Sequence, residues 1–441
     1  MNKLLKEFNI EVKSSVNDAD DYLVFKDKDL LDTFRIKALE KLSDKGFSNK
    51  HINNHIINDV IDEVTYLYDL SNDERMHLYN LIDSEVNGFG PITYLMNDDN
   101  ITEIMINSPS SIYIEVDGVL SRDNSVSFVN DEHIIRTIEK LLEGSGKVID
   151  SHNPMIDARL NDGSRINAII PPLSKNPIVT IRKFKKNIVG MDDLIGNGTL
   201  TPYMARFLET AVRAKLNILV IGGTASGKTT MLNILGNYIP DNERIITIED
   251  VLELNLKQNH VISLETKESD FNFKNGIMIS DLVKNSLRMR PDRIIVGEIR
   301  GNEVFDVLQA MNIGYSGSLT SLHANGCKEA LRKLETMILL GGRDIPNTAI
   351  REYINDAIDL IVHITKMSDG RRKIVDISEV VEANDFGYVI NNIFKFNTVN
   401  VSENGVIQGE FVLQNKNPKV IKKIRDKGIN DLDDIFNNKK K

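Results

Sequence analysis

One segment of the chain combines glycines, a lysine and hydroxyl residues at the spacing of a phosphate-binding loop. Its residues fit G-x-x-x-x-G-K-[ST] at every fixed position and are Gly222, Gly223, Thr224, Ala225, Ser226, Gly227, Lys228, Thr229 and Thr230. In such a loop the backbone N–H groups surround phosphate oxygens, and the N-terminus of the following helix adds partial positive charge. We expect Lys228 to reach the β and γ phosphates of a nucleotide and the Thr229 hydroxyl to ligate Mg²⁺.

The segments on both sides of this loop are those that phosphate binding requires. Residues 217–221 form a short, mostly apolar run, which predicts a buried parallel strand, and residues 231–237 predict a helix. A chance glycine-rich turn is the alternative interpretation, but such a turn would not need a strand before it and a helix after it. The setting therefore favours a phosphate-binding loop.

Two later strands end in carboxylates. Residues 244–248 predict a strand that ends at Glu249, and residues 293–296 predict another that ends at Gly297 and Glu298. Ligands of an open α/β sheet bind at the carboxyl ends of its strands, where a carboxylate can accept a proton from water or hold a metal-bound water. The alternative is that these acids only terminate strands and cap helices. We expect both to be catalytic and assign Glu298 to the metal with Thr229, while their base and metal roles stay exchangeable.

A histidine follows a further predicted strand within residues 316–326. Ser321 and His323 are two residues apart, so on a strand they share one face. A polar side chain there could sense the γ-phosphate, whereas a lone histidine is more often structural. Both interpretations are kept at this point.

The chain of 441 residues corresponds to roughly three domains at about 150 residues each. The pattern of residues 1–70 predicts a helical and flexible appendage. The pattern of residues 71–185 predicts an α+β domain with hairpins at Asp117-Gly118 and Asp162-Gly163. Residues 186–400 alternate strand, turn and helix, which is typical of a mostly parallel sheet. Residues 401–441 predict a basic tail, and the net charge of +5 over residues 411–441 favours a solvated one.

Composition excludes several classes of protein. Lys plus Arg number 54 against 64 Asp plus Glu, so the net charge of −10 argues against binding nucleic acid over the whole surface. Cys327 is the single cysteine, which excludes an internal disulfide and a four-cysteine zinc site. No apolar run approaches a transmembrane length, and the first residues lack a signal-peptide core. We therefore expect a cytoplasmic protein that meets a membrane only through partners.

Together these motifs resemble the secretion ATPases of the type II secretion, type IV pilus and type IV secretion superfamily. The resemblance covers about residues 60–436 and looks closest to the motor ATPase of Tad (Flp) pilus assembly. Its motifs are the Walker A loop at 222–229, an acidic box at 247–253, a Walker B strand ending at 297–300, a histidine box around His323, and N-domain signatures at 101–107, 157–167 and 180–184.

The resemblance implies an α/β fold in which a RecA-like P-loop domain follows a smaller α+β domain and a helical appendage. It implies ATP and Mg²⁺ as ligands, a homo-hexameric ring, and an inner-membrane platform protein as partner. It also implies that Arg159, Arg165 and Arg182 reach the phosphates from the same or a neighbouring subunit, since guanidinium groups stabilise γ-phosphoryl charge. A solvated basic strand face is the alternative for these arginines.

The chain also departs from parts of the superfamily. The four-cysteine zinc module of type II secretion relatives is absent, which favours the Tad or conjugation-type branch, and the first 60 residues match no element of the family. Gly297 stands where an aspartate could precede the Walker B glutamate. The functions left open are a pilus-assembly motor, a conjugation-type secretion ATPase and a nucleotide-gated ring with negligible turnover. A nucleic-acid motor is disfavoured, because no basic–aromatic stacking pattern is present.

Overall fold

The computed structural model describes residues 28–45, 52–68, 70–116, 118–184, 190–267, 276–402 and 405–436. The chain divides into two compact units after residue 185. Residues 1–27 of the predicted appendage, the Asp117 turn position and most of the predicted hinge after residue 184 lie outside the described residues.

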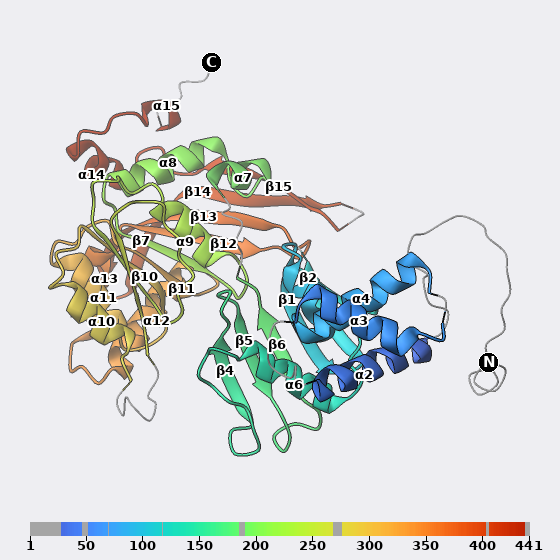
Figure 1. The fold of residues 1–441 in the computed structure, drawn as a ribbon. Helices are drawn as coiled ribbons and strands as arrows, with labels where there is room; N and C mark the ends of the chain where they lie inside the picture. Colours follow the sequence, from blue (N-terminus) through green and yellow to red (C-terminus); the bar gives the residue numbers. More distant parts are fainter. Residues whose placement is uncertain are drawn as a thin grey trace. The chain divides into compact units, whose positions relative to one another are not determined.

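The first unit begins with three packed helices (Figure 1). They are α2 (Lys28–Asp44), α3 (Asn54–Thr65) and α4 (Asn72–Val86). Their shared core includes Phe34, Ile57 and Ile82. Ser71 begins α4 with a capping box, because its hydroxyl accepts from the Glu74 N–H and the Glu74 carboxylate accepts from the Ser71 N–H. The bundle therefore continues past residue 70, where the sequence suggested that the appendage would end.

A six-stranded antiparallel sheet follows in the same unit, in the order β3-β2-β1-β6-β5-β4. Its elements are η1 (Gly90–Ile92), α5 (Thr93–Asn97), β1 (Ile101–Ser108), β2 (Ser111–Val116), β3 (Val119–Asp123), α6 (Asp131–Leu141), β4 (Met155–Arg159), β5 (Arg165–Ile169) and β6 (Ile178–Arg182). Both predicted hairpins are confirmed, as β2–β3 and β4–β5. Helix α6 buries Ile134 and Ile138 in one core with Ile104, Ile166 and Ile181 of the sheet. Alternate strand residues therefore face away from this core.

The second unit is built on a nine-stranded sheet in the order β15-β14-β13-β12-β7-β11-β10-β8-β9. The strands from β12 to β9 run parallel, and β13, β14 and β15 extend the sheet antiparallel. The strands are β7 (Ile218–Gly222), β8 (Ile245–Glu249), β9 (Val261–Glu265), β10 (Arg293–Ile299), β11 (Leu319–His323), β12 (Leu360–Lys366), β13 (Arg372–Asn384), β14 (Gly387–Val401) and β15 (Ile407–Leu413). The predicted α/β fold with a RecA-like domain is confirmed.

Helices cover both faces of this sheet (Figure 1). They are α7 (Met191–Gly196), α8 (Pro202–Arg213), α9 (Lys228–Gly236), α10 (Ile279–Ser286), α11 (Val304–Asn312), α12 (Cys327–Leu340), α13 (Asn347–Ala357), α14 (Val420–Asp426) and α15 (Asp433–Phe436). Ile218 and Val220 of β7 pack with α7, α8, α9, α14 and α15, whereas Leu219 and Ile221 pack with α10 to α13. All five residues of β7 are buried, which explains why its sequence is an unbroken apolar run.

The prediction of a solvated C-terminal tail is wrong for residues 411–436. Strand β15 pairs with β14, and Val420, Ile421 and Ile424 of α14 are buried in the core of the second unit. The Phe436 ring meets the rings of Phe207 and Phe394 at centroid distances of 5.7 and 6.2 Å. The net charge misled the prediction, because the lysines lie on exposed positions while apolar residues spaced three and four apart face the sheet.

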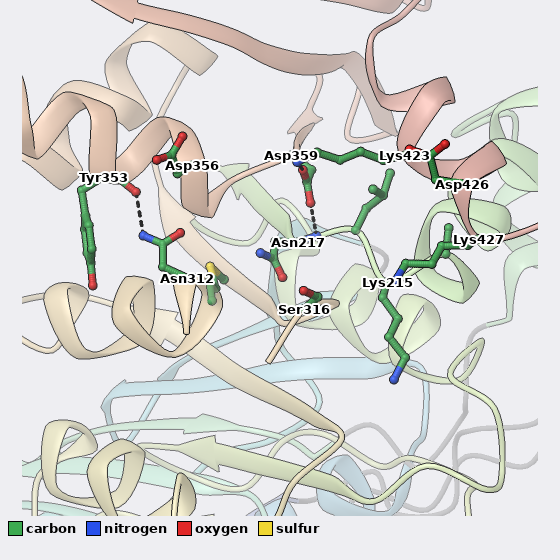
Figure 2. Close-up of a pocket in the computed structure, with 13 residues that line it drawn as sticks. Lys215, Asn217, Asn312, Ser316, Tyr353, Asp356, Asp359, Lys423, Asp426 and Lys427 are labelled. Carbon is green, nitrogen blue, oxygen red and sulfur yellow. Dashed lines mark hydrogen bonds and ion pairs between the residues drawn. The ribbon is translucent and has the colours of Figure 1, made fainter. Parts of the chain in front are cut away.

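A cavity of about 640 Å³ lies beside the amino ends of β7 and β12, next to α14 (Figure 2). Asp359 accepts the backbone N–H of Asn217 at 2.8 Å and pairs with Lys423 of α14. None of the phosphate-loop residues lines this cavity, since the loop leaves β7 at its other end. The cavity is therefore separate from the candidate site.

Candidate nucleotide-binding site

The predicted phosphate loop joins the carboxyl end of β7 to the first residue of α9. Gly227 precedes the helix with φ 101° and ψ 25°, a left-handed conformation in which a side chain would be strained. Ala225 also has a positive φ, of 56°. Positive φ at these two positions is typical of the loop conformation in which successive backbone N–H groups converge on phosphate oxygens.

Lys228 lies at the start of α9 and reaches back along the loop. Its Nζ donates to the Gly223 carbonyl oxygen at 3.2 Å and lies 3.5 Å from Glu298 Oε1. Thr229 follows in the first turn of the helix. The structure thus brings the lysine, the hydroxyl residue and one predicted carboxylate to the same loop.

Glu298 lies in β10, two strands from β7. Besides Lys228, its carboxylate accepts from Arg300, with Nε at 2.7 Å from Oε2. Arg300 also contacts Asp250 at 3.2 Å, so one guanidinium links Glu298 of β10 to the acid that follows β8. Glu298 is consequently a charged group held beside the loop by two cations.

Glu249 ends β8 and lies in a different environment. Its residue is 3% exposed, and its carboxylate accepts the backbone N–H groups of Glu253 and Leu254 at 3.1 Å each. Burial raises the pKa of Glu249 to about 7, and these two hydrogen bonds oppose the shift only in part. A carboxylate whose acid form has a pKa near neutrality is suited to accept a proton from water.

Gly297 precedes Glu298 on β10, and its surroundings explain why glycine stands where an aspartate could precede the Walker B glutamate. A Cβ at position 297 would lie 3.0 Å from Cγ of Glu249. An aspartate there would therefore push against the buried glutamate, whereas glycine leaves room for it.

The strand order places His323 next to the loop. In the parallel pairing of β11 with β7, His323 is opposite Gly222, and its side chain is exposed. Ser321, on the same face of β11, is buried and donates from Oγ to the Gly297 carbonyl oxygen at 2.7 Å. Ser321 thus ties β11 to β10, while the exposed imidazole of His323 is available to a ligand.

The three predicted arginines come together in the first unit. Arg159 pairs with Arg165 across β4 and β5, Arg165 pairs with Arg182 across β5 and β6, and Arg182 pairs with Glu103 on β1. They form a row on the sheet face opposite the core, since Ala158, Ile166 and Ile181 beside them are buried. The sequence separated these arginines by up to 23 positions, and only the strand register aligns them. Their action on a nucleotide remains a prediction.

The sequence did not single out Arg372, yet the structure places it against the loop. Its Nη2 donates to the Ala225 carbonyl oxygen at 3.3 Å from a position 147 residues further along the chain. No local motif marks this residue, because its proximity depends on the pairing of β12 with both β7 and β13.

The residues at the loop could supply only some of the ligands of Mg²⁺, and a bound nucleotide would have to supply others. Among the described residues, no group of three or more His, Cys, Asp or Glu side chains is placed to hold a metal ion. Mg²⁺ is usually bound through one or two protein oxygens, with phosphate oxygens and waters completing its six ligands. The Thr229 hydroxyl and the Glu298 carboxylate could supply the protein share of such a set.

Comparison with known proteins identifies the family of the chain. The sequence model of the family described as "Type II/IV secretion system protein" matches residues 85–404, more than half of the chain. The chain belongs to this family. The match contains the phosphate loop, both carboxylate strands, His323 and the arginine row. The three-helix bundle lies almost entirely outside it, as do β15, α14 and α15.

Relatives within the family share most of their own length with this chain. The type IV secretion system protein VirB11 of Bartonella henselae is 32% identical over 65% of this chain and 90% of that protein. The conjugal transfer protein TrbB of Rhizobium radiobacter is 31% identical over 63% of this chain and 83% of that protein. A crystal structure of the VirB11 ATPase of Brucella suis is 28% identical, covers 66% of this chain and 95% of its own, and aligns with a TM-score of 0.37.

The family match places the chain in the superfamily that its motifs resemble. None of the helices in the described ranges is both long enough and apolar enough to cross a membrane.

Proposed function

We propose that this chain is an ATP-hydrolysing motor of a type II/IV secretion machine. The observation that carries the proposal is that Lys228 of the phosphate loop lies 3.5 Å from Glu298, while Glu249 lies at the carboxyl end of β8, the strand paired with β10. A loop alone would only bind a nucleotide. Hydrolysis also needs a ligand for the metal and a base. Two carboxylates can supply them here, because Glu298 lies next to cations and Glu249 is buried.

The surroundings of Glu298 and Glu249 indicate which of them ligates the metal and which acts as the base, a choice that the sequence left open. Glu298 is held next to Lys228 and near the start of α9, so we assign it with Thr229 to Mg²⁺, which when bound would neutralise charge on the β and γ phosphates. Within the described part of the chain Glu249 has no hydrogen bond to a cation, and its pKa is raised, so we assign it as the base that takes a proton from the attacking water.

The remaining predicted residues would act on the γ-phosphate. His323 ends the strand beside β7 and is exposed there. Arg159, Arg165 and Arg182 form one row of guanidinium groups, which suits them to stabilise charge that spreads over the γ-phosphoryl oxygens. We propose that they do so within a homo-hexamer, from the same or a neighbouring subunit.

The machine that the motor serves is the finer part of the proposal. The relatives named above are a conjugal transfer protein and type IV secretion proteins, which favours a conjugation-type secretion ATPase that moves protein or DNA substrates. Assembly of a Tad (Flp) pilus, the assignment that the motifs suggested first, is the second candidate. In both cases the chain would work at the cytoplasmic side of the inner membrane against a platform protein, without stable nucleic-acid binding of its own.

Steady-state release of phosphate from Mg-ATP by the full chain tests the proposal. We expect Lys228→Ala to abolish turnover while circular dichroism and melting temperature stay close to those of the wild type. Lys328→Ala is the matched control, because it makes the same change at an exposed position in the first turn of α12. A wild-type chain that binds Mg-ATP without turning it over would instead support a nucleotide-gated ring, and normal turnover by Lys228→Ala would refute the loop assignment.

A further inference from the structure

The side chain of Arg372 reaches the phosphate loop from the first residue of β13. Its Nη2 donates to the Ala225 carbonyl oxygen, and its Cδ lies 3.3 Å from where a Cβ on Gly227 would stand. The guanidinium therefore lies along the last turn of the loop, directly before α9. Gly227 leaves the space that this side chain occupies.

One nitrogen of this guanidinium lacks an acceptor. The Nε atom of Arg372 is buried and has no hydrogen-bond partner within the part of the chain that the structure describes. A buried donor left unpaired is costly, and an anion that arrives with a ligand would satisfy it. The loop beside it is built to hold such an anion.

The neighbouring Arg371 has different partners from Arg372. Its guanidinium donates to Asp369 at 2.9 and 2.7 Å and to the Ile407 carbonyl oxygen at 2.8 Å. The hairpin thus uses Arg371 to fix its own turn and directs Arg372 to the loop.

Strand order indicates which part of a nucleotide Arg372 would meet. β12 and β13 lie on one side of β7, whereas β11, β10 and β8 lie on the other side. Lys228, Glu298 and Glu249 mark that other side as the end where the γ-phosphate reacts. Arg372 comes from the opposite side of β7, so the phosphates nearer the ribose are the ones that it would meet.

We propose that Arg372 is a nucleotide-binding residue that holds the diphosphate portion common to ADP and ATP. The inference rests on the proposed function, since it uses the same loop. It assigns Arg372 to retention of nucleotide before and after hydrolysis, a role distinct from the charge stabilisation proposed for the arginine row.

Isothermal titration of the full chain with Mg-ADP and with a non-hydrolysable Mg-ATP analogue tests this role. We expect Arg372→Gln to weaken both ligands by a similar factor of about tenfold or more, the scale of a lost charge-assisted hydrogen bond. Arg372→Lys should recover part of the affinity, because it restores charge but not the forked geometry. Arg371→Gln, the adjacent control, should stay within about twofold of the wild type, and melting temperatures verify that each variant is folded.

Two results would overturn the inference. Wild-type affinity for ADP in folded Arg372→Gln would show that the residue does not contact the diphosphate. Lower affinity for the ATP analogue alone, with the affinity for ADP unchanged, would place Arg372 at the γ-phosphate. Lys228→Ala in the same titrations separates failure of this inference from failure of the proposed function. If Lys228→Ala no longer binds either ligand while Arg372→Gln binds both normally, the loop assignment stands and only the role of Arg372 fails.

Discussion

Replacing Glu249 with Gln should make the nucleotide-free protein more stable at alkaline pH. Gln keeps an oxygen that can accept the N–H groups of Glu253 and Leu254, but it cannot ionise. Burial raises the pKa of the native Glu249 carboxyl from 4.5 to about 7. At 1.36 kcal/mol per pKa unit, the ionised form is disfavoured in the folded state by about 3 kcal/mol.

The sign follows from proton linkage. A carboxyl whose pKa is raised on folding adds stability below its unfolded pKa, and that stability is lost as the pH rises through the folded pKa. For Glu249 the loss falls between about pH 4.5 and pH 7. The variant lacks this titration, so its free energy of unfolding relative to the wild type should grow by about 3 kcal/mol from the acid to the alkaline end of this window.

The assay is urea denaturation of both proteins without nucleotide at a series of pH values, followed by far-UV circular dichroism. Glu253→Gln is the matched control, because it makes the same chemical change four residues away and leaves the buried carboxylate in place. A constant difference between Glu249→Gln and the wild type across the series would refute the argument that burial perturbs this group.

The other predictions concern turnover and assembly. Hydrolysis by the wild type should rise through about pH 7 as Glu249 ionises, and pH–rate profiles should show this limb absent from Glu249→Gln, whose turnover should be lower by roughly two or more decades. Glu298→Gln should still bind nucleotide in titrations but lose a comparable part of its turnover; normal rates in both Gln variants would contradict the paired-carboxylate argument. Mixing inactive Lys228→Ala with inactive Arg165→Ala should restore some hydrolysis if Arg165 acts on a neighbouring subunit, as measured against mixing ratio with oligomer mass followed by light scattering. Phe436→Ala should lower the free energy of unfolding by about 3 kcal/mol or more, because it empties an aromatic contact in the core; an unchanged melting curve would mean that α15 does not pack there.

Local sequence was sufficient for the features that depend on short-range geometry. The loop spacing from Gly222 to Thr229 fixes where backbone N–H groups can converge, and the hairpin at Asp162-Gly163 follows from turn chemistry. The carboxylates at strand ends were predictable because parallel strands place their carboxyl ends at one edge of a sheet. The α/β class followed from the alternation of strand and helix patterns.

Charge and composition were weaker guides where packing decides the outcome. The basic residues of 411–441 favoured a solvated tail, yet Ile424 and Phe436 lie in the core beneath β14 and α8. An amphipathic helix as short as α14 has only one or two turns of apolar pattern, so its burial depends on the surface that receives it. The same holds for Phe436 of α15, whose ring packs on Phe207, more than 200 positions earlier.

The sequence by itself therefore determined which residues can do the chemistry: a lysine and a hydroxyl on a phosphate loop, two glutamates, a histidine and three arginines. Only the tertiary structure decided what surrounds each of them. It buried Glu249 and left Glu298 beside Lys228, it aligned the arginines through strand register, and it brought Arg372 to Ala225 across 147 residues. Burial and proximity depend on the order of strands in the sheet, where β7 lies between β11 and β12, and that order differs from the order of the strands along the chain.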